Sequence, residues 1–415
     1  MSAILKEHLS LNIVFITIAD LPEGGGNTSR LKTLVHALLQ DGHKVTIWNQ
    51  HSLGISPESV LKFEGQIHGA PYDYVLGTTR RGSGFGTIVT KIRAVKEITK
   101  RIVEFQKKNA IDVLWFNQLS FYDIYPLTLI AKHFHIPTIQ SYEDERNEIV
   151  SSEDLTLSRR IFAINSRLGD RLCPELADGI VVISNYLKEK YEKLIKFPEK
   201  VYLIPTIIDC EEWQCGEEED TLVPIILYSG AFAEQDEIEN LLEALAVLRS
   251  NNYKFRVVML GGNKRNLERM TQISAQIDRL GLSSLIDMRG FVPIAEVKQQ
   301  LCQSNILINI RRDGVWSRSG LSTKLSEYLA SGRMVISSDV GDVSQYIRDG
   351  ESALLVPRTT TTSEIAQAIS QGLQSIDTRR KIGAAGRDVA KRYFDVSVAK
   401  VKLQAILDQV MKGNR

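Results

Sequence analysis

Short apolar runs alternate with amphipathic segments along almost the whole chain, and this alternation restricts the possible folds more than any other feature of the sequence. The runs start at Asn12, Lys44, Asp112, Pro137, Gly179, Lys200, Pro224, Phe255, Leu285, Ile306, Met334 and Ser352. Strands that are buried on both faces of a parallel sheet have this composition, and helices between them provide the crossovers. The pattern therefore predicts an α/β chain of doubly wound parallel sheets.

The length and one break in the pattern predict two domains. A chain of 415 residues exceeds one ordinary core. The acidic stretch "DCEEWQCGEEEDTLVP" has neither periodicity, so a linker is expected at 208–223, between an N-terminal domain at 1–207 and a second domain at 224–391. A helix within 392–415 is expected to return to the first domain. Its apolar face consists of Ala399, Leu403, Ile406, Leu407 and Val410.

Composition narrows the class of protein. The formal net charge is only +1, so no overall field attracts nucleic acid. The apolar start "LNIVFITIA" is too short to span a bilayer and is expected to be a buried strand. The four cysteines have no zinc-finger or Cys-x-x-Cys spacing. We expect all four to be reduced thiols in a cytoplasmic protein, with at most a peripheral contact at the inner face of the plasma membrane.

Four glycine-containing loops follow predicted strands, at the sheet edge where such folds bind ligands. They are "LPEGGGNTSR", "YSGAF", "MLGGNKRN" and "NIRRDGVWSRSGLSTK". None contains G-x-G-x-x-G or a Walker A sequence, so those nucleotide fingerprints do not apply. In the first loop Asn27 or Thr28 is placed to cap the following helix, whose N–H groups suit an anion. A flexible turn is the alternative.

The last of these loops has the most specific pattern. Small residues at 319–323 precede the helical segment "TKLSEYLAS", so their amides and hydroxyls can face phosphate oxygens. Glu327, one turn into the helix, can accept hydrogen bonds from a ribose diol. An ordinary helix cap with a surface acid is the alternative. The basic residues that suit phosphate in this segment are Arg311, Arg312, Arg318 and Lys324.

A second loop, "QSYEDERNE", gathers Glu143, Asp144 and Glu145 with Arg146 after a predicted strand. Acids at the carboxyl end of a strand are candidates for acid–base chemistry in a cleft. A solvated run of charges is the alternative. The sequence has no Asp-x-Asp pair, and the close histidines of "AKHFHIP" are interpreted as packing or capping residues, so no metal site is predicted.

Together these motifs resemble the GT-B glycosyltransferases, in particular glycosyltransferase family four. "GGGNTSRLKTLVHALLQDGHKVTIW" resembles the family's opening loop, helix and strand, and "DGIVVISNYLKEKY" and "KVYLIPTIID" resemble the close of its N-terminal domain. "ILYSGAF", "FRVVMLGG", "MRGFVPIAEVKQQLCQSNILI" and "KLSEYLASGRMVISSDVGDVSQYIRDGESALLVP" resemble its nucleotide-binding domain. The resemblance implies two Rossmann-like domains facing a central cleft, and a retaining, metal-independent sugar transfer from a nucleotide-diphosphate donor.

The resemblance also implies roles for individual residues. Glu327 matches the second glutamate of the family's Glu–seven residues–Glu motif, which binds the ribose. Residues 320–323 match the backbone that holds the diphosphate, Gly25 and Gly26 match the loop that approaches it, and "MLGGNKRN" with the residues around Phe291 matches the base-binding region. The residues expected at the donor are Gly25, Gly26, Gly230, Gly261, Gly262, Asn263, Phe291, Val292, Ser319, Gly320, Leu321, Ser322, Thr323 and Glu327. Those expected in catalysis are Glu143, Asp144, Arg312 and Lys324.

The chain departs from the family pattern at charged positions. Ser319 stands where the first glutamate of the motif is expected. Ala231 stands where an arginine follows the glycine, and Asp236 or a neighbour where a lysine precedes the next helix. A sugar-contacting histidine would align near Tyr142 or Glu143. "LSTKLSEYLASG" is more similar to a family variant that ends in "PSKLLEYLAAG", and we expect one of the four basic residues of that segment to replace the missing charge.

A basic segment at 78–108 suggests a membrane contact. Residues 91–108 include seven Lys or Arg and two Glu, with Ile92, Val95, Ile102 and Phe105 at helical spacing. A basic amphipathic helix beside a loop that carries Phe85 suits an anionic leaflet. A helix packed on the core with a solvated outer face is the alternative.

The predicted function is transfer of a hexose from a UDP-sugar such as UDP-glucose to a saccharide or lipid-linked saccharide, in bacterial polysaccharide biosynthesis. UDP is the product and no cofactor is expected; a GDP-sugar stays open as the donor. One alternative is a catalytically silent GT-B protein that binds a nucleotide sugar or a partner. The other is an NAD-linked oxidoreductase, which the missing G-x-G-x-x-G disfavours.

Overall fold

The computed structural model describes residues 10–54, 56, 58–80, 82, 85–108, 110–117, 119–145, 157–262 and 267–413. The chain divides into two compact units. The first contains residues 1–182, 187–204 and 399–415, and the second contains residues 183–186 and 205–398. The stretch expected as a linker, 208–223, therefore counts with the second unit.

The first unit is built on an eight-stranded sheet. Its strands are β1 (Asn12–Thr17), β2 (Lys44–Asn49), β3 (Glu64–Ile67), β4 (Ala70–Tyr74), β5 (Val113–Asn117), β6 (Thr138–Tyr142), β7 (Gly179–Val182) and β8 (Val201–Leu203). They lie in the order β3-β4-β2-β1-β5-β6-β7-β8, and every neighbouring pair is parallel except β3 with β4. Every apolar run predicted as a strand in the first half is confirmed. The central strands are apolar because helices cover both of their faces.

The β3–β4 hairpin has no counterpart among the predicted strands. Three of the four β3 residues are exposed, and β4 contains Pro71, so neither segment has the continuous apolar run of a buried strand. Gly69 makes the turn with φ +96°. β3 pairs with β4 alone and lies at the edge of the sheet, where polar side chains face water and no apolar signal is needed.

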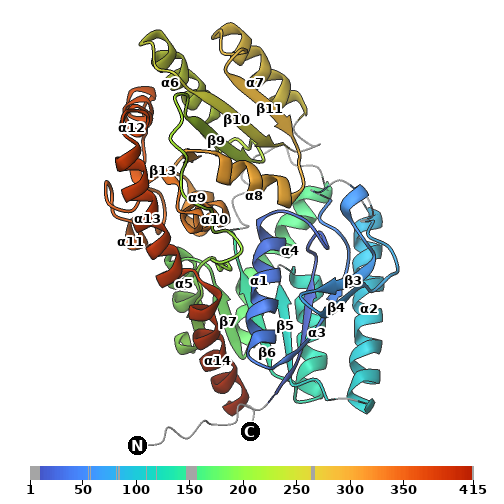
Figure 1. The fold of residues 1–415 in the computed structure, drawn as a ribbon. Coiled ribbons are helices and arrows are strands. Elements are labelled where there is room, and N and C mark those ends of the chain that lie inside the picture. Colours follow the sequence, from blue (N-terminus) through green and yellow to red (C-terminus); the bar gives the residue numbers. More distant parts are fainter. Residues whose placement is uncertain are drawn as a thin grey trace, which may run out of the picture. The chain divides into compact units, whose positions relative to one another are not determined.

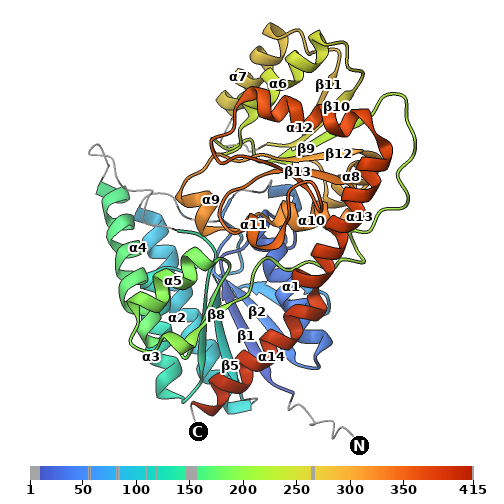
Figure 2. The same ribbon diagram turned by 90° about the vertical axis from the view of Figure 1, so that its left-hand side faces the viewer.

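Helices cover both faces of this sheet, as Figure 2 shows. α1 (Gly26–Gln40) and α14 (Val396–Lys412) lie on one face, and α2 (Phe85–Lys108), α3 (Phe121–His133) and α4 (Leu157–Leu176) lie on the other. The shorter elements are α5 (Asn185–Leu194), η1 (Glu58–Val60) and η3 (Pro198–Lys200). α1 buries the apolar side chains of Leu31, Leu34, Val35 and Leu38, and Gly42, with φ +84°, lies just beyond its end.

The late helix α14 packs on the first unit, which confirms the predicted return. Its buried residues are Ala399, Leu403, Ile406, Leu407 and Val410. At the C-terminal end of α1, the Lys400 ammonium lies 3.5 Å from the Asp41 carboxylate. The Gln404 amide oxygen lies 3.1 Å from Nε2 of His43. The apolar face of α14 therefore completes the core of the first unit, although the other elements of that unit lie before residue 205.

The second unit has a six-stranded parallel sheet, drawn from green to orange in Figure 1. Its strands are β9 (Ile225–Gly230), β10 (Arg256–Gly261), β11 (Ile286–Gly290), β12 (Ile306–Asn309), β13 (Met334–Ser338) and β14 (Leu354–Val356), in the order β11-β10-β9-β12-β13-β14. Its helices are α6 (Ile238–Ser250), α7 (Leu267–Arg279), α8 (Ile294–Gln303), α9 (Val315–Ser319), α10 (Thr323–Ser331), α11 (Val343–Tyr346), α12 (Thr362–Gln374) and α13 (Ile376–Tyr393). Each strand predicted in the second half is confirmed.

The acidic stretch before β9 is fixed to the second unit. Cys215 and Cys302 form a disulfide, with 5.2 Å between their Cα atoms. Glu218 is buried and accepts a hydrogen bond of 2.6 Å from Nε of Arg379. The expectation of four reduced thiols is therefore wrong for this pair. The two cysteines are 87 positions apart, and only the tertiary fold brings them together.

None of the helices in the described parts of the chain combines the length and the hydrophobicity needed to cross a bilayer. Most of the predicted apolar face of α2 packs against the core of the first unit. Ile102 is fully buried, and Val95 and Phe105 pack against the same core, whereas Ile92 is 63% exposed. The core-packed alternative thus describes most of this face, and only its first turns present apolar side chains to solvent.

Candidate functional site

The glycine loops of the second unit meet at one edge of its sheet, because the carboxyl ends of parallel strands point the same way. Gly262 donates its backbone N–H to the carbonyl of Gly230 over 2.9 Å, which joins the ends of β9 and β10. A Cβ on Gly230 would lie 2.7 Å from Nζ of Lys324, so a side chain there would displace the lysine. A Cβ on Gly261 would lie 2.0 Å from the Gly230 carbonyl oxygen. These positions therefore require glycine.

The helix α10 begins at this edge with its N-terminus uncapped by a side chain. Its N-cap is Ser322, whose hydroxyl donates to the Asn309 side-chain oxygen over 3.2 Å and accepts no backbone N–H of the helix. Leu325, Tyr328 and Leu329 are buried, so the apolar face of α10 fixes the helix against the sheet. The backbone N–H groups of the first turn can therefore bind an anion, and the partial positive charge at the N-terminus of the helix favours such binding.

Four basic residues surround this helix start, and two of them are already paired. Nε of Arg312 donates to Glu237 over 2.9 Å, and Arg318 makes a two-pronged pair with Asp313, at 2.7 and 3.0 Å. Both side chains are exposed, at 64% and 49%. The side chain of Arg311 makes no hydrogen bond or ion pair with the residues that the structure describes.

Lys324 differs from the other three because its ammonium lies inside the edge of the sheet. Nζ is 3.9 Å from Oδ1 of Asp236 and 5.2 Å from the centre of the Tyr228 ring. Desolvation by burial lowers the pKa of Lys324, and the nearby Asp236 carboxylate partly offsets that effect. Desolvation alone would raise the pKa of Asp236, but Lys324 and the Tyr228 hydroxyl outweigh it and hold that pKa below its usual value.

Glu327 and Ser319 occupy different environments. Glu327 lies half-buried in the second turn of α10, next to Tyr328, whose hydroxyl accepts the backbone N–H of Ser229 over 3.0 Å. Ser319 is fully buried, and its carbonyl accepts the Ser184 hydroxyl over 2.6 Å. At the end of β11, Phe291 is 47% exposed and Val292 is half-buried, and Asn263 lies outside the described residues.

In the first unit, the glycine loop after β1 leads directly into α1. Gly25 is the N-cap and has no side-chain cap, which corrects the expectation that Asn27 or Thr28 caps the helix. The Thr28 hydroxyl instead donates to the backbone carbonyl of Asp20 over 2.9 Å. A Cβ on Gly24 would lie 2.3 Å from Oγ1 of Thr28, whereas a Cβ on Gly25 would meet no atom within 4 Å. The loop is therefore tight at Gly24 and open at Gly25.

The acids after β6 are not a solvated run. Glu143 is buried, its Oε1 lies 3.3 Å from Nε of Arg30, and the same oxygen accepts the Asn117 amide over 3.0 Å. Arg30 is fully buried in α1 and also donates to the Ile204 carbonyl over 2.7 Å. Burial lowers the pKa of Arg30, and Glu143 partly offsets this. A buried charged network thus joins α1 to three strand ends.

The two neighbouring acids, Glu145 and Asp144, differ in burial. Glu145 is buried and receives Nζ of Lys190 at 2.7 Å, and Lys190 also contacts Asp170 at 3.0 Å. Burial alone would lower the pKa of Lys190, but the two carboxylates outweigh it and raise that pKa. Asp144 is exposed, and Arg146 lies outside the described residues.

Comparison with known proteins identifies the family of this chain. The sequence model described as Glycosyltransferase Family 4 matches residues 24–212, and the one described as Glycosyl transferases group 1 matches residues 223–375. The two matches together cover every strand of the two sheets except β1. The chain belongs to glycosyltransferase family 4.

Individual relatives of this family 4 member are distant. It is 20% identical to an alpha-maltose-1-phosphate synthase of Mycolicibacterium smegmatis over 53% of this chain and 60% of that protein. It is 21% identical to a putative colanic acid biosynthesis glycosyltransferase of Salmonella typhimurium over 51% of this chain and 52% of that protein. The chain thus spans between half and two thirds of the length of these curated relatives.

Solved structures show the GT-B fold of the family 4 chain. A sucrose-phosphate synthase from Thermosynechococcus elongatus superposes with a TM-score of 0.74 at 16% identity, over 97% of this chain and all of that one. The Anabaena protein HepE, solved in complex with UDP-glucose, superposes with a TM-score of 0.67 at 13% identity, over 97% and 99% of the two chains. At these identities the likeness concerns the fold alone.

Three of the residues described above have no expected family role. Tyr228 and Asp236 form the surroundings of Lys324, and Arg30 forms those of Glu143. A single signal in the sequence points to Arg30, a charged residue directly beside the apolar face of α1. Asp236 carries a signal as well, because it stands in the region where the family has a lysine.

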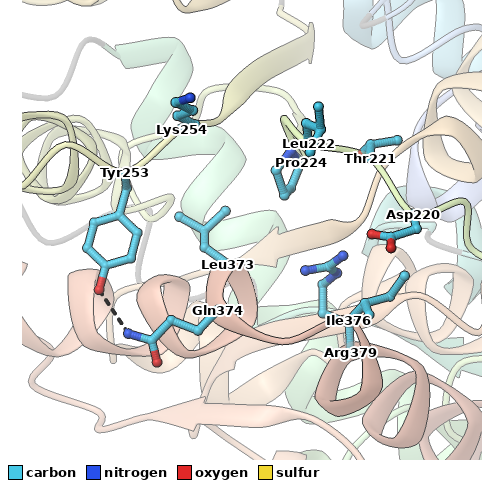
Figure 3. A pocket seen from close by; sticks show the side chains of 10 residues that line it. All are labelled: Asp220, Thr221, Leu222, Pro224, Tyr253, Lys254, Leu373, Gln374, Ile376 and Arg379. Carbon is cyan, nitrogen blue, oxygen red and sulfur yellow. Dashed lines mark hydrogen bonds between the residues drawn. The ribbon is translucent and has the colours of Figure 1, made fainter.

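A separate hollow lies at the amino ends of the second sheet, opposite the glycine loops, and has a volume of about 300 Å³ (Figure 3). Tyr253 and Leu373 line it, and the Gln374 amide donates to the Tyr253 hydroxyl over 2.9 Å. Asp220, which belongs to the acidic stretch, and Arg379 line the other side of the hollow. In α/β sheets ligands bind at the carboxyl edge, so this hollow is not assigned to the donor.

Proposed function

We propose that this family 4 chain transfers a hexose from a UDP-sugar, such as UDP-glucose, to a saccharide or lipid-linked saccharide acceptor in bacterial polysaccharide biosynthesis. The reaction proceeds with retention and without a metal ion. The observation that carries the proposal is the meeting of an uncapped helix start with two cations, Lys324 and Arg311, at the carboxyl edge of the second sheet. The binding of UDP or UDP-glucose by relatives of the same fold supports this choice of donor.

The donor diphosphate lies against the start of α10 in this proposal. The amides and hydroxyls of 320–323 face its oxygens, and Lys324 and Arg311 balance the charge that develops on the leaving group. Fixed donors and cations of this kind stabilise a leaving diphosphate because they need no rearrangement during the reaction. Arg312, expected in this role from the sequence, is held by Glu237 and faces solvent, so the proposal moves the role to Arg311.

The remaining donor contacts follow the strand ends. Glu327 accepts the ribose hydroxyls, and the base lies toward Gly261, Gly262 and the exposed ring of Phe291. Glycine at Gly230 leaves room for the lysine and the phosphates. Gly25 and Gly26 approach the donor from the first unit, where the open space beside Gly25 accepts a ligand atom.

Glu143 acts in this proposal as a positioning residue, because its carboxylate is buried and engaged by Arg30 and Asn117. It fixes α1 and hence the glycine loop that α1 follows. Asp144 is exposed, and in this proposal it is the acid of this loop that faces the acceptor side.

A lipid-linked acceptor requires a contact with the membrane, which we place on the outer side of α2 and α3. The first turns of α2 expose Val89 and Ile92, and α3 exposes Tyr122, Tyr125 and Leu129. The same helix, α2, carries seven lysines and arginines within 91–108. Each basic residue near an anionic surface contributes about 1 kcal/mol. Flotation with vesicles containing phosphatidylglycerol should carry the protein, and neutral vesicles should not. Recovery in the soluble fraction with both would exclude this contact.

Transfer is tested by release of UDP from UDP-glucose and other UDP-sugars, with and without lipid-linked saccharides. We expect release that depends on the acceptor. The rival function is a silent protein that binds the nucleotide, and the observations that favour it are the missing glutamate at Ser319 and the acid at Asp236. Thermal stabilisation by UDP without release under any acceptor would support the silent protein and overturn transfer.

A further inference from the structure

The surroundings of Lys324 contain an acid that the family pattern does not provide. Asp236 lies on the loop after β9, in the region where the family has a lysine, and its Oδ1 is 3.9 Å from Nζ of Lys324. Only 4% of Asp236 is exposed, and it is held from two sides. The Tyr228 hydroxyl donates to Oδ2 over 2.7 Å, and the Ala233 backbone N–H donates to the same oxygen over 3.2 Å.

Such an acid is unexpected at a diphosphate site. A carboxylate this close to two phosphates repels them, so a site selected only for donor affinity would exclude it. Asp236 does not serve as an N-cap, because Glu237 is the N-cap residue of α6 and makes no side-chain cap. Its two hydrogen bonds to Tyr228 and Ala233 use one oxygen, and the other oxygen faces the lysine.

We propose that Asp236 is a positioning residue that keeps Lys324 charged and in place at the diphosphate site. This inference rests on the proposed donor site. The ammonium of Lys324 lies over the Tyr228 ring and against Gly230, where it has lost part of its water. Burial of this kind favours the neutral form of a lysine, which no longer attracts phosphate. The charge of the absent family lysine is thus replaced by one cation that a neighbouring acid maintains.

The other groups that face Lys324 do not compensate for the loss of Asp236. Arg311, from the loop after β12, is a like charge and favours the neutral lysine. Glu327, on α10 itself, favours the charged form but ranks after Asp236 and Arg311 in its effect. The Tyr228 hydroxyl stays protonated, because burial raises the pKa of Tyr228 well above its usual value. Asp236 is therefore the group whose removal changes the charge on Lys324 most.

The test is the pH dependence of UDP binding to the full chain, measured by calorimetry from pH 7 to pH 10. Asp236→Asn keeps a hydrogen-bond acceptor for Tyr228 but removes the charge. We expect the alkaline loss of UDP affinity to begin about 1–2 pH units lower than in the wild type. Above that point affinity should fall about tenfold for each pH unit. At pH 7 the loss should be smallest, since a charge that repels phosphate is gone.

Two variants control this result. Glu234→Gln removes the same charge from an exposed position on the same loop and should leave the pH profile unchanged. Lys324→Arg places a cation that does not titrate in this range, so its alkaline loss of affinity should disappear. Adding Asp236→Asn to Lys324→Arg should then shift nothing. If Asp236→Asn does not fold, the disappearance of the alkaline limb in Lys324→Arg still decides whether Lys324 is the titrating group.

A second readout does not depend on UDP. The rate at which acetic anhydride modifies Lys324, followed by mass spectrometry against pH, reports the pKa of the lysine itself. The curve should move to lower pH in Asp236→Asn. An unmoved curve, with UDP affinity lowered equally at every pH, would show that Asp236 is only structural and overturn the inference. A wild type that binds no UDP while the acetylation curve moves would overturn the donor site instead.

Discussion

At the scale of single residues, charge partners decide which side chains are available for a ligand. The sequence places four basic residues beside the start of α10 without distinguishing them. The structure separates them by their acids, because Arg312 and Arg318 are paired at the surface, Lys324 is close to Asp236, and Arg311 is left to meet a ligand. Glu327 is the single acidic residue of α10.

Glu327 is the most direct test at this scale. Glu327→Gln keeps the shape of the side chain and removes the charge that accepts hydrogen bonds from the ribose. A hydrogen bond to a charged group contributes about 1.5–3 kcal/mol, so we expect UDP affinity to fall about tenfold to a hundredfold. Calorimetry with UDP measures this. An affinity equal to that of the wild type would place the ribose elsewhere.

The buried pair of Arg30 and Glu143 gives a second prediction at this scale. Glu143→Ala leaves a buried guanidinium without its partner, and such losses cost about 3–5 kcal/mol. The midpoint of urea unfolding should fall accordingly. Asp144→Ala, at the exposed neighbouring position, should change the midpoint little. If both variants unfold at the same urea concentration, the network does not support the fold.

At the scale of elements, a buried ion pair adds to the apolar packing between α2 and α3. Lys91 of α2 donates to Asp123 of α3 over 2.6 Å and to the Ser120 hydroxyl over 2.6 Å. Asp123 is fully buried. Burial alone would raise the pKa of Asp123, but Lys91 and Ser120 outweigh it and lower that pKa. The pair therefore determines how α2 sits on α3 and, with it, the exposed side chains at the start of α2.

The lowered pKa of Asp123 fixes the sign of a pH effect. A carboxylate with a depressed pKa in the folded state contributes stability above its unfolded pKa, near pH 4, and loses it as the pH falls through the folded value. Lys91→Met removes the partner and should lower the unfolding free energy at pH 7 by about 3–5 kcal/mol. Because Asp123 is then buried without a cation, the deficit should shrink as the pH falls toward 4.

Lys100→Met is the matched control for this prediction, since Lys100 lies on the same helix and is 65% exposed. It should change the unfolding free energy by less than about 0.5 kcal/mol at either pH. Urea titrations at pH 7 and pH 4 measure both variants. A deficit in Lys91→Met that does not vary with pH would contradict the assignment to Asp123.

At the scale of the whole molecule, the acidic stretch before β9 belongs to the second unit and is closed by a disulfide. The Cys215–Cys302 bond encloses a long loop, and such bonds stabilise folded proteins by about 2–4 kcal/mol. Replacing both cysteines with serine should lower the melting temperature of the second unit and leave that of the first unchanged. Scanning calorimetry distinguishes the two transitions. Equal shifts in both would show that the units do not unfold separately.

The sequence predicts most of the elements but not the contacts between distant residues. The buried strands are predictable because each is a continuous apolar run, and β3–β4 is not, because polar residues and Pro71 interrupt it. α14 is predictable from its apolar face. The pairing of Cys215 with Cys302, and of Lys324 with Asp236, depends on tertiary contacts between segments that are distant in the sequence. Contacts of this kind leave no signal in the local sequence.

The return of α14 gives the chain a nested topology, in which the second unit is an insertion within the first. During synthesis the first sheet would emerge early but would expose the apolar surface that Leu403 and Leu407 later cover. The inserted unit, by contrast, has all of its strands in one continuous stretch. A fragment that stops after β8 would therefore lack part of its own core, whereas one that joins β8 directly to α14 would contain every helix and strand of that core.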